Sequence, residues 1–406
     1  MSDLVTRAQL VILAKQLHVP VERVQYLEKL GAAHLLELRQ AVADFLFDEN
    51  SETFNRISAL VPIVPLSIAM PIVQKVTAPE MAGRAAGAVG VAHPKKAVQA
   101  MTLVKPEYGA LCAPFMDPRA VGTLAETAPH EPVVAIANVL LASKDYITGG
   151  LFVEAATPEL IRAVEAGVDD DEGLIRTGSY VYSGKVLSEV LRVMVEASPA
   201  RISRLVRTTV EGPVDLQLAA LSVFSRLDGD LVETIGDVLF DEIDVSTVAT
   251  LVRNYLANEA GSELLEFAGN LSSSALDTFA ANPVLEDDDA LRTLVDAASD
   301  KDAPGVWRGL VDVTAHANAA TQAKILDFVL ETGDGIPARL AHVATAGHLW
   351  PSVLRLLSSQ DDSLQERIAE KWQPSLADGE HATVARHIQE LRLDDSLKAL
   401  KKVLAR

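Results

Sequence analysis

The chain has little of what disulfide-bonded and zinc-binding proteins need. Its 406 residues include one cysteine, Cys112, so neither an intramolecular disulfide nor a zinc site built from paired cysteines is available. Aromatic residues make up only 5% of the chain, and most of its hydrophobic residues are Ala, Leu and Val. This composition suits closely packed helices better than a β-sandwich, and the sequence lacks the period-two alternation typical of half-buried strands.

Recognisable catalytic motifs are absent as well. A phosphate-binding loop has four residues between its glycines and a Ser or Thr after its lysine, whereas segment 178–186 has five and ends on Val186, so we interpret it as a turn. Cys112 has His93 and His130 one repeat to either side, but its apolar neighbours favour a small buried hydrophobe over a nucleophile. We assign no catalytic residue and no cofactor, while an enzyme of unfamiliar type remains an alternative.

Histidine and acidic residues do not show metal-binding spacing. His342 and His348, like His381 and His387, are six residues apart, so neither pair shares the face that an i, i+4 zinc motif uses on a helix. The aspartate clusters lack the alternating pattern and the terminal Glu of a calcium loop. We predict exposed turns at these clusters and no metal site.

The charge of the chain is strongly negative and unevenly placed. The net charge is −20; residues 1–150 carry 14 acids and 13 bases, whereas residues 151–406 carry 42 acids and 23 bases. An acidic surface of this kind repels nucleic acid. It is typical either of a well-solvated surface or of a contact surface for a basic partner. The first residues show no basic segment followed by an apolar core, so we expect a cytoplasmic protein.

A recurring phrase, a residue followed by proline and often an acid, indicates the architecture. It occurs at 78–80 (APE), 105–107 (KPE), 128–130 (APH), 157–159 (TPE) and 198–200 (SPA). Proline at the first helical position loses no hydrogen bond, and an acid in the first turn suits the positive end of the helix dipole. We therefore predict an all-α fold, a curved, solenoid-like array of short helical hairpins.

Composition divides this array into three predicted parts. Residues 1–50 form a helical N-terminal unit, residues 51–165 hold proline-rich repeats of low charge, and residues 166–406 hold acidic repeats. Segment 13–24 resembles a helix-turn-helix, but few basic residues follow it, so a plain helical hairpin is the favoured interpretation.

An internal similarity lies within the middle part. Ala97 and Ala120 occupy corresponding positions at an offset of 23 residues, as do Pro106 and Pro129. Such a fixed offset indicates that successive helix pairs stack, each burying the face that its neighbour leaves open.

The longest uncharged run is the strongest candidate for a contact surface. Residues 57–74 carry no charge, but three prolines interrupt the run, and lipid cannot satisfy the backbone groups that they free. We therefore predict a buried or docking segment rather than a transmembrane span. Its candidate binding residues are Ile63, Ile68 and Ile72.

A second candidate is an arginine stripe within the acidic part. Arg201, Arg204 and Arg207 are spaced by three, which places them along one side of a helix, where they could hold an anion or an acidic partner. Pairing with acids inside the protein is the favoured alternative. The acids considered for this pairing are Glu211, Asp215 and Asp228.

Two phrases resemble a known group of proteins. Residues 146–154 (YITGGLFVE) with 157–162 (TPELIR), and the segment 340–357 around GHLWP, are similar to uncharacterised bacterial helical-repeat proteins. These resemble, more distantly, the N-terminal helical domain of MgtE magnesium transporters. The resemblance, strongest over residues 57–165, implies a right-handed stack of short helices. It does not imply magnesium binding, because the transmembrane half of those transporters has no counterpart in this sequence.

From these features we expect a non-enzymatic cytoplasmic scaffold or adaptor that binds a partner protein, or a second copy, through a helical-repeat surface. The alternative is peripheral association with a lipid surface or an apolar ligand through residues 57–76. Nucleic acid is not an expected partner.

Overall fold

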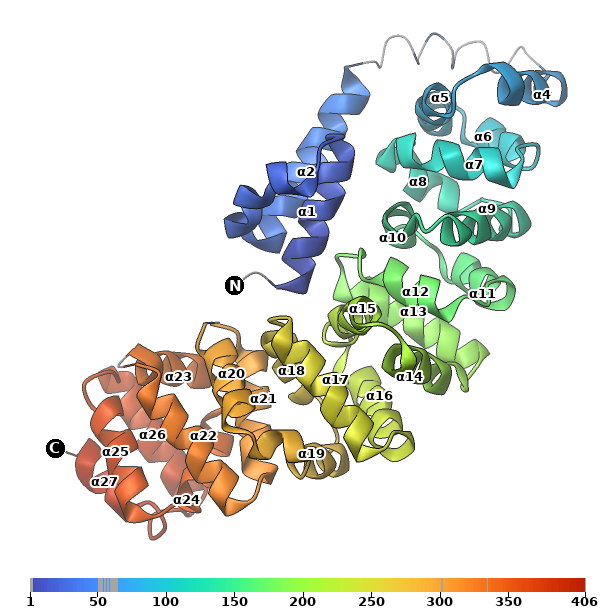
Figure 1. The fold of residues 1–406 in the computed structure, drawn as a ribbon. Helices are drawn as coiled ribbons and strands as arrows, with labels where there is room; N and C mark the ends of the chain where they lie inside the picture. The colour runs from blue at the N-terminus through green and yellow to red at the C-terminus, as the bar shows by residue number, and fades with distance from the viewer. Residues whose placement is uncertain are drawn as a thin grey trace. The chain divides into compact units, whose positions relative to one another are not determined.

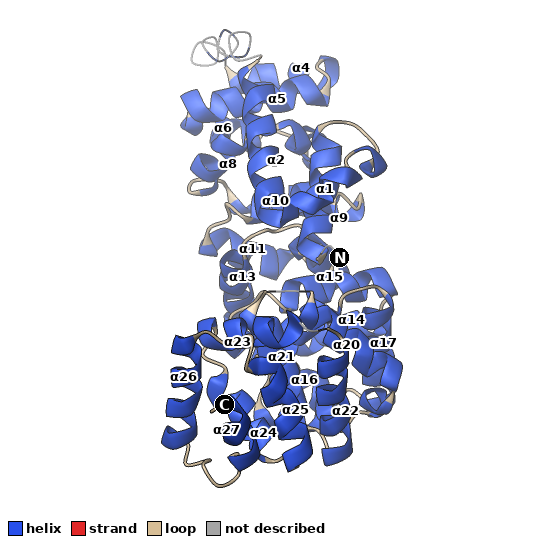
Figure 2. Cartoon of the chain, turned by 90° about the vertical axis from the view of Figure 1, so that its left-hand side faces the viewer, coloured by secondary structure: helices blue, strands red, loops and turns tan. Residues whose placement is uncertain are grey.

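The described residues of the computed structural model are 3–49, 54, 56, 58, 65–300, 302–333 and 335–405. All regular structure among them is helical, and none of these residues lies in a strand (Figure 2). The predicted all-α class is therefore confirmed. The chain forms two compact units, Ser2–Val223 and Phe224–Arg406, which are described separately below. The division into three parts by composition stays a prediction.

The first unit begins with a helical hairpin that has a core of its own. Its elements are α1 (Leu4–Gln16), η1 (Val21–Arg23), η2 (Gln25–Leu30) and α2 (Gly31–Asp48). The side chain of Asp3 caps α1 by accepting a hydrogen bond from the backbone N–H of Thr6. Leu10, Leu13 and Leu35 pack together between the two long helices. We call residues 3–49 the N-terminal hairpin.

The rest of the first unit is a succession of short helices. They are α4 (Leu66–Val76), α5 (Pro79–Ala92), α6 (Pro94–Met101), α7 (Pro106–Cys112), η3 (Ala113–Phe115), α8 (Pro118–Ala125), α9 (His130–Ala142), α10 (Tyr146–Val153), α11 (Pro158–Gly167), α12 (Asp171–Gly178), α13 (Gly184–Ala197), α14 (Arg201–Glu211) and α15 (Val214–Phe224). Alternate helices pack against each other, α5 on α7, α7 on α9, α9 on α11 and α11 on α13 (Figure 1).

Prolines begin several of these helices, with two corrections to the sequence-based prediction. Pro79, Pro106 and Pro158 each occupy the first helical position. Pro129 instead precedes α9 as its N-cap residue, in extended conformation. Pro199 lies ahead of α14, because the N–H of Arg201 closes a turn onto the carbonyl of residue 198 at 2.9 Å and the helix starts only there.

The two alanines that mark the internal similarity lie in the same apolar cluster. Ala97 on α6 and Ala120 on α8 are both buried and pack with Leu124 in one apolar cluster. Helix α6 contacts α8, and α5 contacts both. Small side chains at these two positions therefore allow three helices to approach closely.

The second unit is also entirely helical in its described residues. Its elements are α16 (Gly229–Glu242), α17 (Val245–Ala257), α18 (Gly261–Ala268), α19 (Ser273–Ala280), η4 (Pro283–Glu286), α20 (Asp288–Ser299), α21 (Pro304–His316), α22 (Ala319–Glu331), α23 (Gly335–Ala346), α24 (Trp350–Ser358), α25 (Asp362–Trp372), α26 (Asp378–Glu390) and α27 (Lys398–Leu404). Trp307, Trp350 and Trp372 are fully buried in its core, and the rings of the last two meet edge to face.

Candidate interaction surface

Helix α4 carries a row of exposed apolar side chains. Ile68, Ile72 and Val76 are 64%, 55% and 77% exposed, and a spacing of four places them on one face of the helix. We call these three residues the α4 stripe. Leu66 is the buried residue of α4. A contiguous row of aliphatic side chains facing solvent is typical of a contact surface rather than of a free helix face.

The structure tests only part of the residue set predicted for this segment. It places Ile68 and Ile72 on the surface, and Ile63 lies outside the described residues. Val76 completes the row and is absent from the predicted set, although its spacing of four from Ile72 is the signal that would have found it.

Polar contacts on the opposite side of α4 hold the helix so that the stripe faces outward. The side-chain amide of Gln74 donates to the carbonyl of Leu103 at 3.2 Å and accepts from the backbone N–H of Lys105 at 2.7 Å. The hydroxyl of Tyr108 donates to the carbonyl of Thr77 at 2.9 Å, just beyond the end of the helix. Figure 1 shows α4 beside α5 and α6. These bonds attach α4 to α7 and to the turn that precedes it, which fixes the orientation of the stripe.

The surroundings of the α4 stripe are locally basic in an acidic protein. Residues 65–116 contain five basic and two acidic side chains, whereas the whole chain has a net charge of −20. Arg84 pairs with Glu80 at 2.9 Å. The exposed Lys75 and Lys105 form no ion pair within the described part of the chain. Lys75 neighbours the aliphatic row on α4, so this surface suits a partner that combines apolar and acidic groups.

Cys112, at the end of α7, is not poised for nucleophilic chemistry. The residue is buried, and burial raises the pKa of its thiol to about 11, while a hydrogen bond with Tyr108 opposes that rise. A thiol with so high a pKa is protonated at neutral pH, and the thiolate is the nucleophilic form. This geometry fits the packing role that the sequence favoured.

The arginine stripe is largely occupied by contacts inside the protein. Arg201 is buried, with Nε 2.7 Å from Asp171 and Nη2 donating to the carbonyl of Val168 at 3.2 Å. The half-exposed Arg204 also reaches Asp171, at 3.2 Å. Arg207 lies on the outer side of the same helix. Internal pairing is therefore present for the first two arginines.

The acids that pair with Arg201 and Arg204 differ from those considered from the sequence. Glu165 and Asp169, with Asp171, supply the carboxylates, and all three precede α14 in the chain. The sequence-based prediction considered only acids that follow the arginines in the chain. In the structure α14 packs against α12, which begins at Asp171 and precedes α14 in the chain. A binding role for the arginine stripe stays a prediction.

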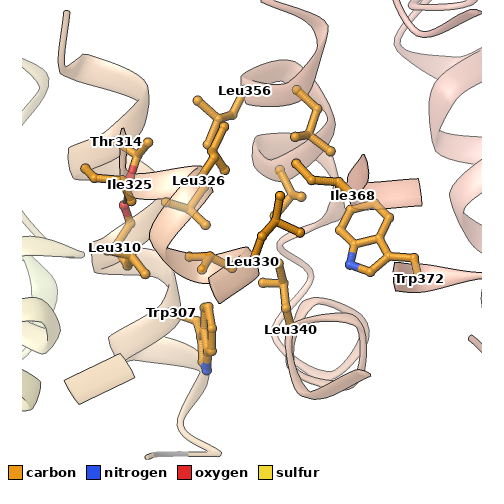
Figure 3. Close-up of a pocket in the computed structure, with 14 residues that line it drawn as sticks. Trp307, Leu310, Thr314, Ile325, Leu326, Leu330, Leu340, Leu356, Ile368 and Trp372 are labelled. Atoms are coloured by element: carbon orange, nitrogen blue, oxygen red, sulfur yellow. Dashed lines mark hydrogen bonds between the residues drawn. The ribbon is translucent and has the colours of Figure 1, made fainter. Parts of the chain in front are cut away.

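The second unit contains a small pocket of about 40 Å³ (Figure 3). Its walls are apolar side chains from α21 to α25, including Trp307, Leu330 and Trp372. Thr314 contributes a hydroxyl, whose hydrogen is donated to the carbonyl of Leu310 at 2.6 Å. We interpret the space as an imperfection of core packing, because small apolar spaces in a protein stay dry.

In the described ranges, no three His, Cys, Asp or Glu side chains are grouped so that they could hold a metal ion. No described helix combines the length and the apolar character that crossing a membrane requires.

Comparison with known proteins adds no family to this description. No protein-family model matches the chain, and no curated protein matches it. The resemblance to bacterial helical-repeat proteins and to the MgtE N-terminal domain therefore stays a prediction.

Proposed function

We propose that the protein is a non-enzymatic scaffold that binds a partner protein through the α4 stripe. The observation that carries this proposal is the exposure of Ile68, Ile72 and Val76 on a helix whose other side is fastened by Gln74. Burying aliphatic surface of this kind on association is favourable by about 25 cal/mol per Å². The proposal also places the protein in the cytoplasm, as expected from its sequence.

The packing of alternate helices supports a solenoid-like array as the framework of this scaffold. In the first unit α10 packs on α12 and α12 on α14, and in the second unit α18 packs on α20 and α20 on α22. In stacked repeats each helix pair contacts mainly its neighbours, and the resulting extended surfaces are used for binding. The distant resemblance to the MgtE N-terminal domain fits this framework and is part of the proposal.

The proposed partner presents an amphipathic helix with acidic flanks. A row of side chains spaced by four is complementary to another helix, whose side chains recur at the same interval. Lys75, exposed on α4 next to Val76, favours carboxylates on the partner. A lipid surface is the second candidate, since the same combination of aliphatic and basic groups suits anionic headgroups over an apolar layer.

Affinity capture with matched variants tests the proposal. The tagged wild-type protein, an Ile68→Asp/Ile72→Asp variant and a Val245→Asp control are each used to capture proteins from the host. Val245 is a suitable control because it is also an exposed aliphatic residue, 50% accessible, and lies on the second unit. Captured proteins are then purified and their affinities for the three forms are measured.

The proposal expects a partner whose affinity falls at least tenfold with the double variant and is unchanged with the control. Identical partners and affinities for all three forms would contradict it. Flotation with neutral and with phosphatidylglycerol-containing vesicles examines the second candidate. Binding to vesicles that disappears in Ile68→Asp/Ile72→Asp, without any protein partner, would replace the scaffold by peripheral lipid association.

A further inference from the structure

The N-terminal hairpin meets α10 through polar side chains at both ends of that helix. The ammonium group of Lys15 lies 2.5 Å from Asp145, the N-cap residue of α10, and donates to the hydroxyl of Thr148 at 3.1 Å. At the other end, Glu154 is the C-cap residue of α10, and its negative charge acts on Arg39 of α2. The beginning of α10 is therefore fastened to the hairpin by a direct ion pair, and the contact at its end is of a different kind.

Two polar side chains in the interior of the hairpin lack hydrogen-bond partners. Gln9 on α1 is 0% exposed and Arg39 on α2 is 5% exposed. Within the described residues, neither the amide oxygen nor the amide nitrogen of Gln9 has a hydrogen-bond partner, and Nη1 of Arg39 has none. A buried donor or acceptor in this state costs about 1–3 kcal/mol, and a charged group costs more. Because native proteins rarely leave such groups unsatisfied, these three atoms indicate a bound guest.

The register of the hairpin brings the two side chains to the same level. Leu13 of α1 and Leu35 of α2 belong to one apolar cluster. Gln9 and Arg39 each lie four residues from one of these leucines, on the side away from the loop that joins the two helices. Residues four apart share a face of a helix, and one turn is about 5.4 Å long. Gln9 and Arg39 therefore face the same interior, one turn beyond the two leucines.

The carboxylate of Glu154 completes the group from the α10 side. Burial lowers the pKa of Arg39, and the negative charge of Glu154 opposes that effect, although no hydrogen bond joins the two side chains within the described residues. One carboxylate oxygen of Glu154 accepts the backbone N–H of Tyr182 at 2.7 Å, which fixes its position. Opposite charges that interact without direct contact are the arrangement in which a bridging water is expected.

The donors and acceptors of these side chains suit a small neutral guest. Arg39 and the amide nitrogen of Gln9 need an acceptor, whereas the amide oxygen of Gln9 needs a donor. An anion would be repelled by Glu154 and would supply no donor, and a cation would be repelled by Arg39. Water is neutral and both donates and accepts. Buried water typically makes about three hydrogen bonds to groups that are otherwise unsatisfied.

We propose that Gln9, Arg39 and Glu154 form a buried water-binding site that joins the N-terminal hairpin to the end of α10. Water at this site accepts hydrogen bonds from Nη1 of Arg39 and Nε2 of Gln9. It donates to Oε1 of Gln9 and to the carboxylate of Glu154. The site is the water-mediated counterpart of the direct pair between Lys15 and Asp145 at the other end of the helix. It is independent of the α4 stripe.

Magnetic relaxation dispersion of water deuterons, which measures the number of long-lived internal water molecules, tests the proposal on the full chain. Wild type is compared with Gln9→Met and with Arg39→Met, each of which replaces a polar group by a flexible apolar side chain. Gln217→Met is the matched control, because Gln217 is also buried in the first unit but its amide nitrogen donates to the carbonyls of Val210 and Gly212. Circular dichroism verifies that each variant is helical.

The proposal expects Gln9→Met and Arg39→Met each to lower the number of long-lived water molecules, and Gln217→Met to leave it unchanged. An unchanged number in either site variant, or an equal loss in the control, would overturn it. A crystal structure of the wild-type protein that shows ordered water gives a second measurement, which needs no variant. Water is expected within hydrogen-bond distance of Nη1 of Arg39 and of the Gln9 amide. A direct hydrogen bond between these two side chains, or no ordered water beside them, would overturn the proposal.

Discussion

The Nε atom of Arg201 lies 2.7 Å from Oδ1 of Asp171, and only 3% of the arginine side chain is exposed. Asp171 opens α12 and Arg201 opens α14, so the pair joins the N-terminal ends of two helices that pack against each other. Glu165 supplies a second carboxylate, 3.5 Å from Nη1. The buried guanidinium therefore fixes the position of α14 within the first unit.

Removing this guanidinium is expected to destabilise the first unit strongly. Arg201→Ala leaves the carboxylates of Asp171 and Glu165 without their buried partner, which typically costs about 3–5 kcal/mol. Arg204→Ala is the matched control, because its side chain is 48% exposed and such pairs contribute about 0–1 kcal/mol. Urea unfolding followed by hydrogen exchange over α11 to α14 measures both. Similar losses of unfolding free energy in Arg201→Ala and Arg204→Ala would contradict the structural role assigned to the buried Arg201.

Two glycines, one in a crowded helix crossing and one facing open space, give a second prediction. A Cβ atom on Gly309 would collide with the carbonyl of Leu265, because α21 crosses α18 at backbone contact there, whereas a Cβ on Gly122 meets nothing within 4 Å. Gly309→Ala should therefore lower the free energy of unfolding by at least about 1–3 kcal/mol, the cost typical of an overpacked core. Gly122→Ala should instead stabilise α8 by about 0.5–1 kcal/mol. Thermal unfolding of each unit measures the two changes, and a stabilising Gly309→Ala would refute the close crossing.

The helical class and many helix ends could be predicted from local signals. Pro79, Pro106 and Pro158 begin helices because their chemistry suits the first turn, and Asp170 and Asp287, taken from acidic turns, accept backbone N–H groups at the N-termini of α12 and α20. These signals act within four residues and need no tertiary context. Pro199 is the exception, because a turn closed by the N–H of Arg201 onto the carbonyl of Ser198 separates it from α14.

The contacts between distant segments could not be predicted in this way. Lys15 and Asp145 are 130 residues apart, and neither stands in a motif that names the other. Arg201 pairs with acids that precede it rather than with those that follow, because the direction of packing is a property of the whole unit. The exposure of Ile68 and Ile72 likewise depends on a distant segment, because residues 103 and 105 form hydrogen bonds with Gln74 on the other side of α4.

The pocket in the second unit gives a prediction of increased stability. Val329→Ile adds one methylene next to a void of about 40 Å³, and filling it should stabilise the unit by up to about 0.8 kcal/mol. Val245→Ile is the control, since that side chain is half exposed and the change should be neutral. Differential scanning calorimetry compares the two. A lower melting temperature for Val329→Ile would show that the space cannot accept the extra group.

Cys112 predicts a dependence of stability on pH. Burial holds the pKa of the folded thiol at about 11, above its ordinary value of 9.0. The unfolded thiol therefore loses its proton first as the pH rises, so the contribution of Cys112 to stability is full below pH 9.0 and is lost as the pH rises toward about 11. The unfolding midpoints of wild type and Cys112→Ala, compared from pH 7 to 11, isolate this contribution. A difference that stays constant over that range would contradict the buried, protonated thiol.

Photocrosslinking from position 72 tests the central claim, that the α4 stripe is a protein-binding surface, most directly. Ile72→benzoylphenylalanine places a reactive ketone in the middle of the row, and Val245→benzoylphenylalanine places one on the control surface of the second unit. Irradiation in the host should give a discrete protein adduct from position 72 and none from position 245. Equal labelling from both positions, or labelling of lipid alone from position 72, would contradict the account.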